Sequence, residues 1–174
     1  MGSGKTTLGR AIPQRMRERG LAPLEFADLD DEVEKAAGMT VAEIFRTCGE
    51  EGFRRLESET LKALARRGGM IIACGGGTPC RPENMELMNS CGTTVLLEAG
   101  TDVLVRRLME APAGQRPLLN GLKGAAEVET YVVRTIAARS PHYSKATHRF
   151  DSSHLETVEE VRDAADRMID TFLL

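Results

Sequence analysis

The chain has 174 residues, of which 41% are hydrophobic, and it carries a formal net charge of −3. This length and composition are typical of one domain with a single continuous core. The negative charge balance disfavours a nucleic-acid binder, because such proteins usually carry a basic excess that neutralises phosphates. The longest apolar runs are strand-sized, too short to span a bilayer, and no secretory leader is evident. The sequence therefore predicts a cytoplasmic protein with neither a nucleic acid nor a membrane as partner.

The glycine-rich stretch MGSGKTT matches half of a phosphate-binding motif. In the full pattern, G-x-x-x-x-G-K-[ST], backbone N–H groups cradle phosphates, the lysine neutralises them and the hydroxyl reaches Mg²⁺. Gly4, Lys5 and Thr6 supply the second half, and the first glycine would lie two places upstream of Met1. The strand that leads into such a loop lies in the centre of its sheet, where losing it would leave backbone groups unpaired. We therefore expect the first, central strand to be missing from this chain and to be encoded upstream.

Short apolar strands alternate with helical segments along the rest of the chain. This alternation implies right-handed crossovers and an α/β fold, in which helices cover both faces of a central parallel sheet. No repeat or linker divides the chain, so we expect one domain over residues 1–174. The expected strands are 24–28, 70–74, 93–98 and 147–153, and the expected helices are 5–20, 30–38, 40–48, 50–67, 101–110 and 125–140, with further helices from Pro82 and from about Thr157.

The segment 111–124 interrupts this regular alternation. Its proline, glycine and polar residues are typical of a loop, and it contains Arg116. An arginine in such a loop can swing onto the γ-phosphate of a bound nucleotide when the loop closes. We therefore expect a mobile lid at about 111–124.

Two acids, Asp28 and Asp30, lie at the end of the strand 24–28. Alternate residues of a strand share a face, so both carboxylates are expected to point into one cleft. One could hold magnesium through water while the other accepts a proton. The competing interpretation is a helix N-cap with acids in the first turn, because Asp31 and Glu32 follow directly. Local sequence leaves both interpretations open.

Two further arginines, Arg54 and Arg139, each have a simple structural explanation. Arg54 lies four residues after Glu50 and three before Glu57, a spacing that predicts surface ion pairs along a helix. Arg139 lies near a helix end, where the helix dipole alone favours a cation. Taken singly, neither arginine indicates a binding site.

Taken in chain order, the motifs resemble one family. The stretches GSGKTTLGR, FADLD, GEEGFRRLE, CGGGTP, QRPLL and ARSPHY are similar to the successive motifs of shikimate kinases, spacing included. The resemblance extends from Met1 to the last helix, and its double-aspartate, Phe-Arg and triple-glycine motifs are more specific than the phosphate loop. It implies a P-loop kinase fold and ATP- and Mg²⁺-dependent phosphorylation of the 3-hydroxyl of shikimate, a step of chorismate and aromatic amino acid biosynthesis. It also implies a monomer.

The resemblance implies a role for each matching residue. Lys5 and Arg116 would stabilise the transferring phosphoryl group, and Asp30 would bind the shikimate hydroxyls and act as the base. Magnesium would be held by Thr6 and, through water, by Asp28. The residues implied for shikimate are Asp30, Arg54, Gly75, Gly76, Gly77 and Arg139, and those for ATP are Gly2, Ser3, Gly4, Lys5, Thr6, Thr7 and Arg116.

The resemblance does not decide the contacts to adenine. An arginine shortly before the lid would stack on the base, and either Arg106 or Arg107 fits this position. The late loop 151–154 lies where the family places a second adenine contact. It offers no arginine, so backbone groups would recognise the base there.

Two alternative functions remain open from sequence. One is another small P-loop kinase, such as a gluconate or nucleoside monophosphate kinase, which Arg54 and the glycines 75–77 disfavour. The other is a nucleotide-binding module without catalysis, suggested by the incomplete phosphate-binding motif.

Overall fold

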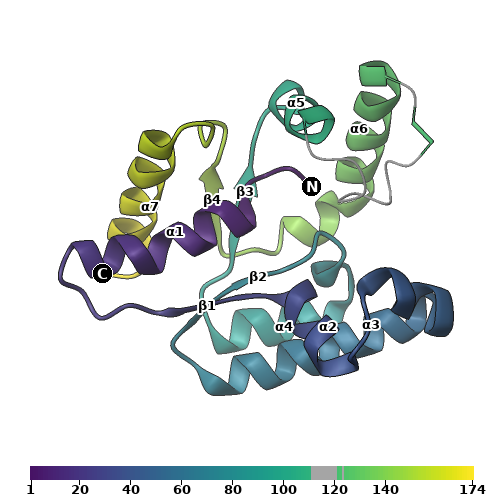
Figure 1. Cartoon of the computed structure of the whole chain (residues 1–174), viewed down its shortest axis with the longest axis horizontal. Helices are drawn as coiled ribbons and strands as arrows, with labels where there is room; N and C mark the ends of the chain where they lie inside the picture. Colours follow the sequence, from purple (N-terminus) through teal and green to yellow (C-terminus); the bar gives the residue numbers. More distant parts are fainter. Residues whose placement is uncertain (111–120, 123) are drawn as a thin grey trace.

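The computed structural model describes residues 1–110, 121–122 and 124–174, and shows helices packed around short parallel strands (Figure 1). The predicted lid, including Arg116, lies almost wholly outside the described residues. All predicted strands and helices are present, and a short 3-10 helix, η1, was not predicted. The elements are α1 Lys5–Glu18, β1 Glu25–Asp28, α2 Leu29–Ala37, α3 Val41–Arg67, β2 Met70–Ala73, η1 Thr78–Cys80, α4 Pro82–Cys91, β3 Val95–Glu98, α5 Thr101–Glu110, α6 Gly124–Tyr143, β4 His148–Asp151 and α7 Val158–Phe172.

The strands pair in two small parallel sheets. β1 pairs with β2, with Asp28 opposite Ala73, and β3 pairs with β4, with Glu98 opposite Asp151. The predicted α/β class with parallel strands is therefore confirmed, in the form of two pairs among the described residues. Ligands of parallel α/β folds collect beyond the carboxyl ends of the strands. The loops that carry the predicted site begin at these ends of β1 and β2.

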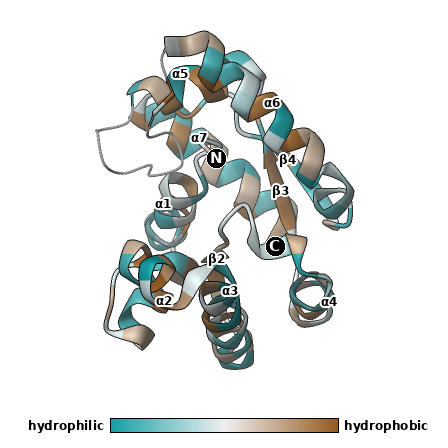
Figure 2. Ribbon diagram, turned by 90° about the vertical axis from the view of Figure 1, so that its right-hand side faces the viewer, coloured by the Kyte–Doolittle hydropathy of each residue, from teal (hydrophilic) through white to brown (hydrophobic). Residues whose placement is uncertain are grey.

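Three apolar clusters hold the helices against the strands and against one another. α1 packs on α7, α2 packs on β1 and on α3, α3 packs on β2, and α5 packs on α6. Figure 2 shows apolar residues along β3 and both apolar and polar stretches around the helices. Full burial of each large apolar side chain stabilises the fold by about 1.5–3 kcal/mol. The buried side chains of these clusters include Leu8, Ile12, Ile169, Leu29, Val33, Ile44, Leu61, Leu104 and Val132.

Local sequence signals set the ends of α2 and α3. Gly38 ends α2 in the left-handed conformation, with φ 65°, which glycine adopts without strain. The predicted capping box opens α3, because the Thr40 hydroxyl accepts from the Glu43 N–H and the Glu43 carboxylate accepts from the Thr40 N–H. The helices predicted over 40–48 and 50–67 join within α3 at Gly49, whose backbone is not helical (φ 68°, ψ −176°).

Candidate active site

The phosphate loop leads directly into α1. Gly4 is the N-cap residue in a left-handed conformation, with φ 81°, and Lys5 is the first helical residue. No side chain of the described residues caps this helix end, so the first-turn N–H groups and the positive end of the helix dipole can meet an anion. Ser3 is buried beside them, whereas Thr7 is exposed. The geometry is that of a phosphate-binding helix N-terminus.

Thr6 and Asp28 bring a hydroxyl and a carboxylate together beside this loop. Thr6 Oγ1 donates to Asp28 Oδ2 at 2.7 Å, which joins α1 to the end of β1. Mg²⁺ prefers oxygen ligands and usually keeps several waters, with substrate phosphates completing its shell, so this pair of oxygens fits it. The described residues contain no group of three or more acidic, histidine or cysteine side chains that could hold a metal by themselves. The donors present therefore suit a magnesium ion shared with a nucleotide.

The alternation argument placed Asp30 at the end of the strand together with Asp28, but Asp30 does not lie on the strand. β1 ends at Asp28, and Asp30 belongs to the first turn of α2. The prediction was wrong because the chain turns into a helix immediately after Asp28, whose Oδ1 accepts from the Asp30 N–H at 3.2 Å as an N-cap. The N-cap interpretation of Asp28 is confirmed, and its other carboxylate oxygen accepts from Thr6 Oγ1. Asp30 Oδ1 lies against the glycine loop, 3.4 Å from the place where a Cβ on Gly75 would be.

The surroundings of Asp30 suit a general base. Burial, followed by the negative charges of Asp28 and Glu57, raises the pKa of Asp30 to about 6, against the smaller opposing effect of Lys5 and Arg54. A base is most efficient when its pKa lies near the working pH, because it is then ionised and still basic enough to take a proton.

Glu57 is a buried carboxylate whose role the sequence interpretation missed. Its side chain is 0% exposed and accepts from Arg54 Nη1 at 2.9 Å and from Thr78 Oγ1 at 2.6 Å. Arg54 is itself only 19% exposed, so a surface ion pair describes its 3.4 Å contact with Glu50 but not its contact with Glu57. The signal was available, because Glu57 lies four residues after buried Phe53, within the apolar stripe of α3. Glu57 therefore fixes both Arg54 and the start of η1.

Arg54 and Arg139 converge on the glycine loop from α3 and α6. A Cβ on Gly77 would lie 2.5 Å from Arg54 Nη2, and one on Gly76 would lie 2.7 Å from Arg139 Nη1. Only residues without a side chain allow cations this close to the backbone. Both arginines line one cavity of about 700 Å³ together with Gly77. The structure thus unites three predicted motifs that are far apart in sequence.

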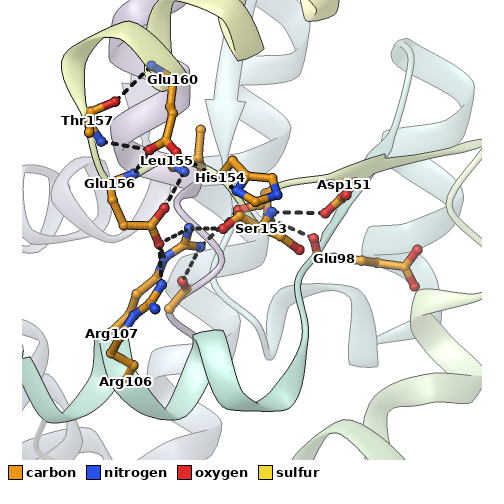
Figure 3. Close-up of polar contacts among 12 residues, drawn as sticks. Glu98, Arg106, Arg107, Asp151, Ser153, His154, Leu155, Glu156, Thr157 and Glu160 are labelled. Atoms are coloured by element: carbon orange, nitrogen blue, oxygen red, sulfur yellow. Dashed lines mark hydrogen bonds and ion pairs between the residues drawn. The ribbon is translucent and has the colours of Figure 1, made fainter.

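A second cluster joins α5 to the late loop. The Arg107 guanidinium donates to the carbonyl oxygens of Ser152 at 3.0 Å, Ser153 at 3.1 Å and Gly2 at 3.3 Å, and to Glu156 Oε1 at 2.9 Å (Figure 3). One side chain therefore links the beginning of the phosphate loop to the loop that follows β4.

Arg106 and Arg107, which the sequence could not distinguish, have different environments. Arg106 makes one ion pair with Glu156 and is 52% exposed, whereas the Arg107 side chain is 14% exposed. Burial acts to raise the pKa of Glu156, but the Leu155 N–H and the two arginines lower it to about 2. Glu156 is therefore ionised at neutral pH and binds both arginines.

These features define an enzyme that transfers a phosphoryl group to a small anionic acceptor. The charges that act on Asp30 include Lys5 and Asp28, at the phosphate-binding helix end, and Arg54, one of the two arginines at the glycine loop. The P-loop nucleotide motif and the acceptor cavity belong to the same set of loops at the strand ends.

Comparisons with known proteins identify the family. The sequence model of the shikimate kinase family matches residues 1–170, and the chain belongs to this family. A shikimate kinase of Phocaeicola vulgatus is 40% identical over 168 residues, which cover 97% of this chain and 91% of the relative. The crystal structure of shikimate kinase from Bacteroides thetaiotaomicron aligns with a TM-score of 0.90 at 37% identity, covering 100% of this chain and 94% of that one. Shikimate kinase from Acinetobacter baumannii in complex with shikimate aligns with a TM-score of 0.78 at 29% identity, covering 98% and 87%. The P-loop kinase fold predicted by resemblance is confirmed.

Proposed function

We propose that this protein transfers the γ-phosphoryl group of ATP to the 3-hydroxyl of shikimate, giving shikimate 3-phosphate in the route to chorismate and aromatic amino acids. The observation that carries this proposal is the convergence of Arg54 and Arg139 on Gly76 and Gly77 at one cavity. Guanidinium groups bind a carboxylate with paired, charge-assisted hydrogen bonds, so the cavity suits a small carboxylic acid. The Acinetobacter baumannii relative, which binds shikimate, supports the choice of acceptor.

The residues divide the chemistry between them. Asp30 accepts the proton of the 3-hydroxyl, whose oxygen bonds to the γ-phosphorus while ADP leaves with the electrons of the broken bond. Lys5, at the N-terminus of α1, neutralises charge on the transferring group. Thr6 and Asp28 would hold Mg²⁺, which when bound neutralises charge between the β- and γ-phosphates. Arg116, outside the described residues, remains our proposal for the lid arginine.

The adenine end of ATP is proposed to lie near α5 and the late loop. Hydrogen bonds join Arg107 to the backbone of Ser152 and Ser153 and to Gly2, in the phosphate loop. The described part of this loop offers backbone groups and no arginine of its own, in keeping with base recognition by the backbone.

A panel of acceptors tests the proposed function. ADP release, measured with ATP and Mg²⁺, is expected to be fastest with shikimate, and phosphorus NMR of the product should place the phosphate on the 3-hydroxyl. Gluconate and nucleoside monophosphates serve as competing acceptors. If the protein binds ATP but phosphorylates one of these in preference to shikimate, it is another small P-loop kinase. If it binds ATP without any transfer, it is a nucleotide-binding module without catalysis.

We further propose that residues 1–174 act as a single domain and as a cytoplasmic monomer without nucleic-acid or membrane partners. The net charge of −3 supports the absence of a nucleic-acid partner. Over the described ranges, no helix has both the length and the apolar character required to cross a membrane. Light scattering at working concentrations tests the monomer, since a mass twice the 19.0 kDa of the chain would contradict it.

A further inference from the structure

The hydroxyl of Tyr143 lies between the glycine loop and Arg139. It donates to the Gly76 carbonyl oxygen at 2.8 Å, and the Arg139 guanidinium lies beside the same glycine. A Cβ on Gly76 would lie 2.7 Å from Arg139 Nη1 and 3.0 Å from Tyr143 Oη, so the three groups are packed against one another. One hydroxyl therefore lies where a cation of the acceptor cavity meets the backbone of the glycine loop.

The position of Tyr143 on α6 explains this arrangement. Arg139 precedes it by four residues, so both side chains lie on the same helix face. The phenol is half-buried, and burial raises its pKa above the ordinary value, against a smaller lowering by Arg139. Tyr143 is therefore protonated at neutral pH, where its hydroxyl can donate to Gly76 beside the Arg139 cation.

We propose that Tyr143 is a positioning residue for the acceptor, which holds the Arg139 guanidinium and the Gly76 backbone in the relative arrangement that receives the acceptor carboxylate. This inference rests on the proposed function, because that function assigns Arg139 to the carboxylate. Tyr143 acts through Arg139, so loss of its hydroxyl should weaken acceptor binding more than the chemical step. Within the described part of the chain, the hydroxyl bonds to Gly76, beside Arg139, and not to the phosphate loop or the late loop, so ATP binding should not change.

The variant Tyr143→Phe removes the hydroxyl and keeps the ring. We expect KM for shikimate to rise about three- to tenfold, the size of effect expected for the loss of one hydrogen bond. We expect kcat to stay within about threefold and KM for ATP to stay unchanged. The matched control is Tyr131→Phe, which alters the only other tyrosine of the chain, on the same helix, and should behave as the wild type.

Shikimate methyl ester separates this inference from the proposed function. The wild type should prefer shikimate to its ester, and absence of that preference would overturn the assignment of the carboxylate to Arg139 and Arg54. Given the preference, Tyr143→Phe should reduce it about three- to tenfold, because the ester has no charge for Arg139 to bind. Equal weakening of both acceptors, no weakening of either, or an equal rise in KM for ATP would overturn the role of Tyr143 alone.

A second measurement does not depend on the folding of Tyr143→Phe. The chain has no tryptophan, so in Tyr131→Phe the emission of tyrosine comes from Tyr143 alone. Saturating shikimate should change this emission and ATP without shikimate should not. An emission that does not respond to shikimate would contradict the inference.

Discussion

The acceptor side and the nucleotide side of the active site are stabilised in different ways. Beside the acceptor cavity one ion pair is withdrawn from water, since Glu57 is fully buried and bonds to both Arg54 and Thr78. On the nucleotide side, the described cations of α5 contact an ionised Glu156 near the surface and backbone carbonyls of the late loop.

This difference predicts unequal tolerance to substitution. Removing one partner of a buried ion pair leaves an uncompensated charge and costs about 3–5 kcal/mol, whereas an exposed pair contributes about 0–1 kcal/mol. Single substitutions that remove a charge on the acceptor side should therefore cause a large loss. On the nucleotide side, such substitutions should each cause a small loss. The changes below test this contrast from the largest expected effect to the smallest.

The largest effect is expected at Asp30, between the two sides. Asp30→Asn removes the base and should lower kcat about 10²–10⁴-fold. In the wild type, kcat/KM should fall as the pH drops below about 6, because Asp30 then becomes protonated. Steady-state assays across the pH range check both points. Asp31→Asn, at the exposed acid next in sequence, is the control; equal loss in both variants would contradict the role of Asp30.

The same variant should stabilise the fold. The pKa of Asp30 is raised from 3.8 to about 6, so the folded state binds the proton more tightly and stability falls as the pH rises through this window. Asp30→Asn should therefore be more stable than the wild type at pH 7 by about 1–2 kcal/mol, allowing for partial exposure, and nearly equal below the unfolded pKa. Thermal melts of both proteins at pH 7 and below pH 3.8 test this. A lower melting temperature for Asp30→Asn than for the wild type at pH 7 would contradict it.

Arg54→Ala should separate the two ligands. Loss of the charged hydrogen bonds to the substrate carboxylate should cost about 2–5 kcal/mol of shikimate binding, with ATP binding unchanged. Calorimetric titration with each ligand measures this directly. Arg55→Ala, at the exposed neighbouring arginine, provides the control. If Arg54→Ala weakened both ligands equally, Arg54 would not be specific to the acceptor.

Glu57→Gln tests the support behind Arg54. The amide keeps a hydrogen bond to Thr78 but removes the charge that orients the guanidinium, so we expect about 1–3 kcal/mol lower stability and a higher KM for shikimate. Glu59→Gln, exposed on the same helix, should change neither quantity. Chemical denaturation and steady-state kinetics provide the measurements. If Glu57→Gln were indistinguishable from Glu59→Gln, Glu57 would have no role in supporting Arg54.

The smallest effect is expected on the nucleotide side. Arg107→Ala should raise KM for ATP about three- to tenfold, because several modest hydrogen bonds to the late loop and to Gly2 are lost. Arg106→Ala should change KM for ATP less than about twofold, since the ion pair of Arg106 with Glu156 is exposed. KM for shikimate should not change in either variant. A larger effect for Arg106→Ala would assign the nucleotide contact to Arg106 instead.

The fold was predictable because its local signals agree with one another. Apolar spacing along α1, the glycine that ends α2 and the capping box that opens α3 each specify an element without help from distant residues. Their order along the chain also matched the family motifs. The sequence therefore supplied the α/β class and brought Lys5, Asp30, Arg54 and Arg139 into consideration as one set.

The details that could not be predicted depend on contacts between elements. Glu57 is charged yet buried because Thr78, from another element, completes its hydrogen bonds. The position of Asp30 depends on where the backbone leaves β1, which a two-residue spacing cannot decide. Tyr143 meets Gly76 only because α6 packs beside η1. Tertiary packing, and not local propensity, determines each of these three positions.

Gly38 and Gly77 lack a side chain for different reasons, and saturation mutagenesis should distinguish them. Gly38 has φ 65° and open space where a Cβ would lie, so asparagine, which tolerates this conformation, should be recovered there. Gly77 has φ −90°, which any residue can adopt, but a methyl group would collide with Arg54. Second-site suppressors of substitutions at Gly77 should therefore map to the cation that occupies this space, whereas those at Gly38 should restore backbone shape.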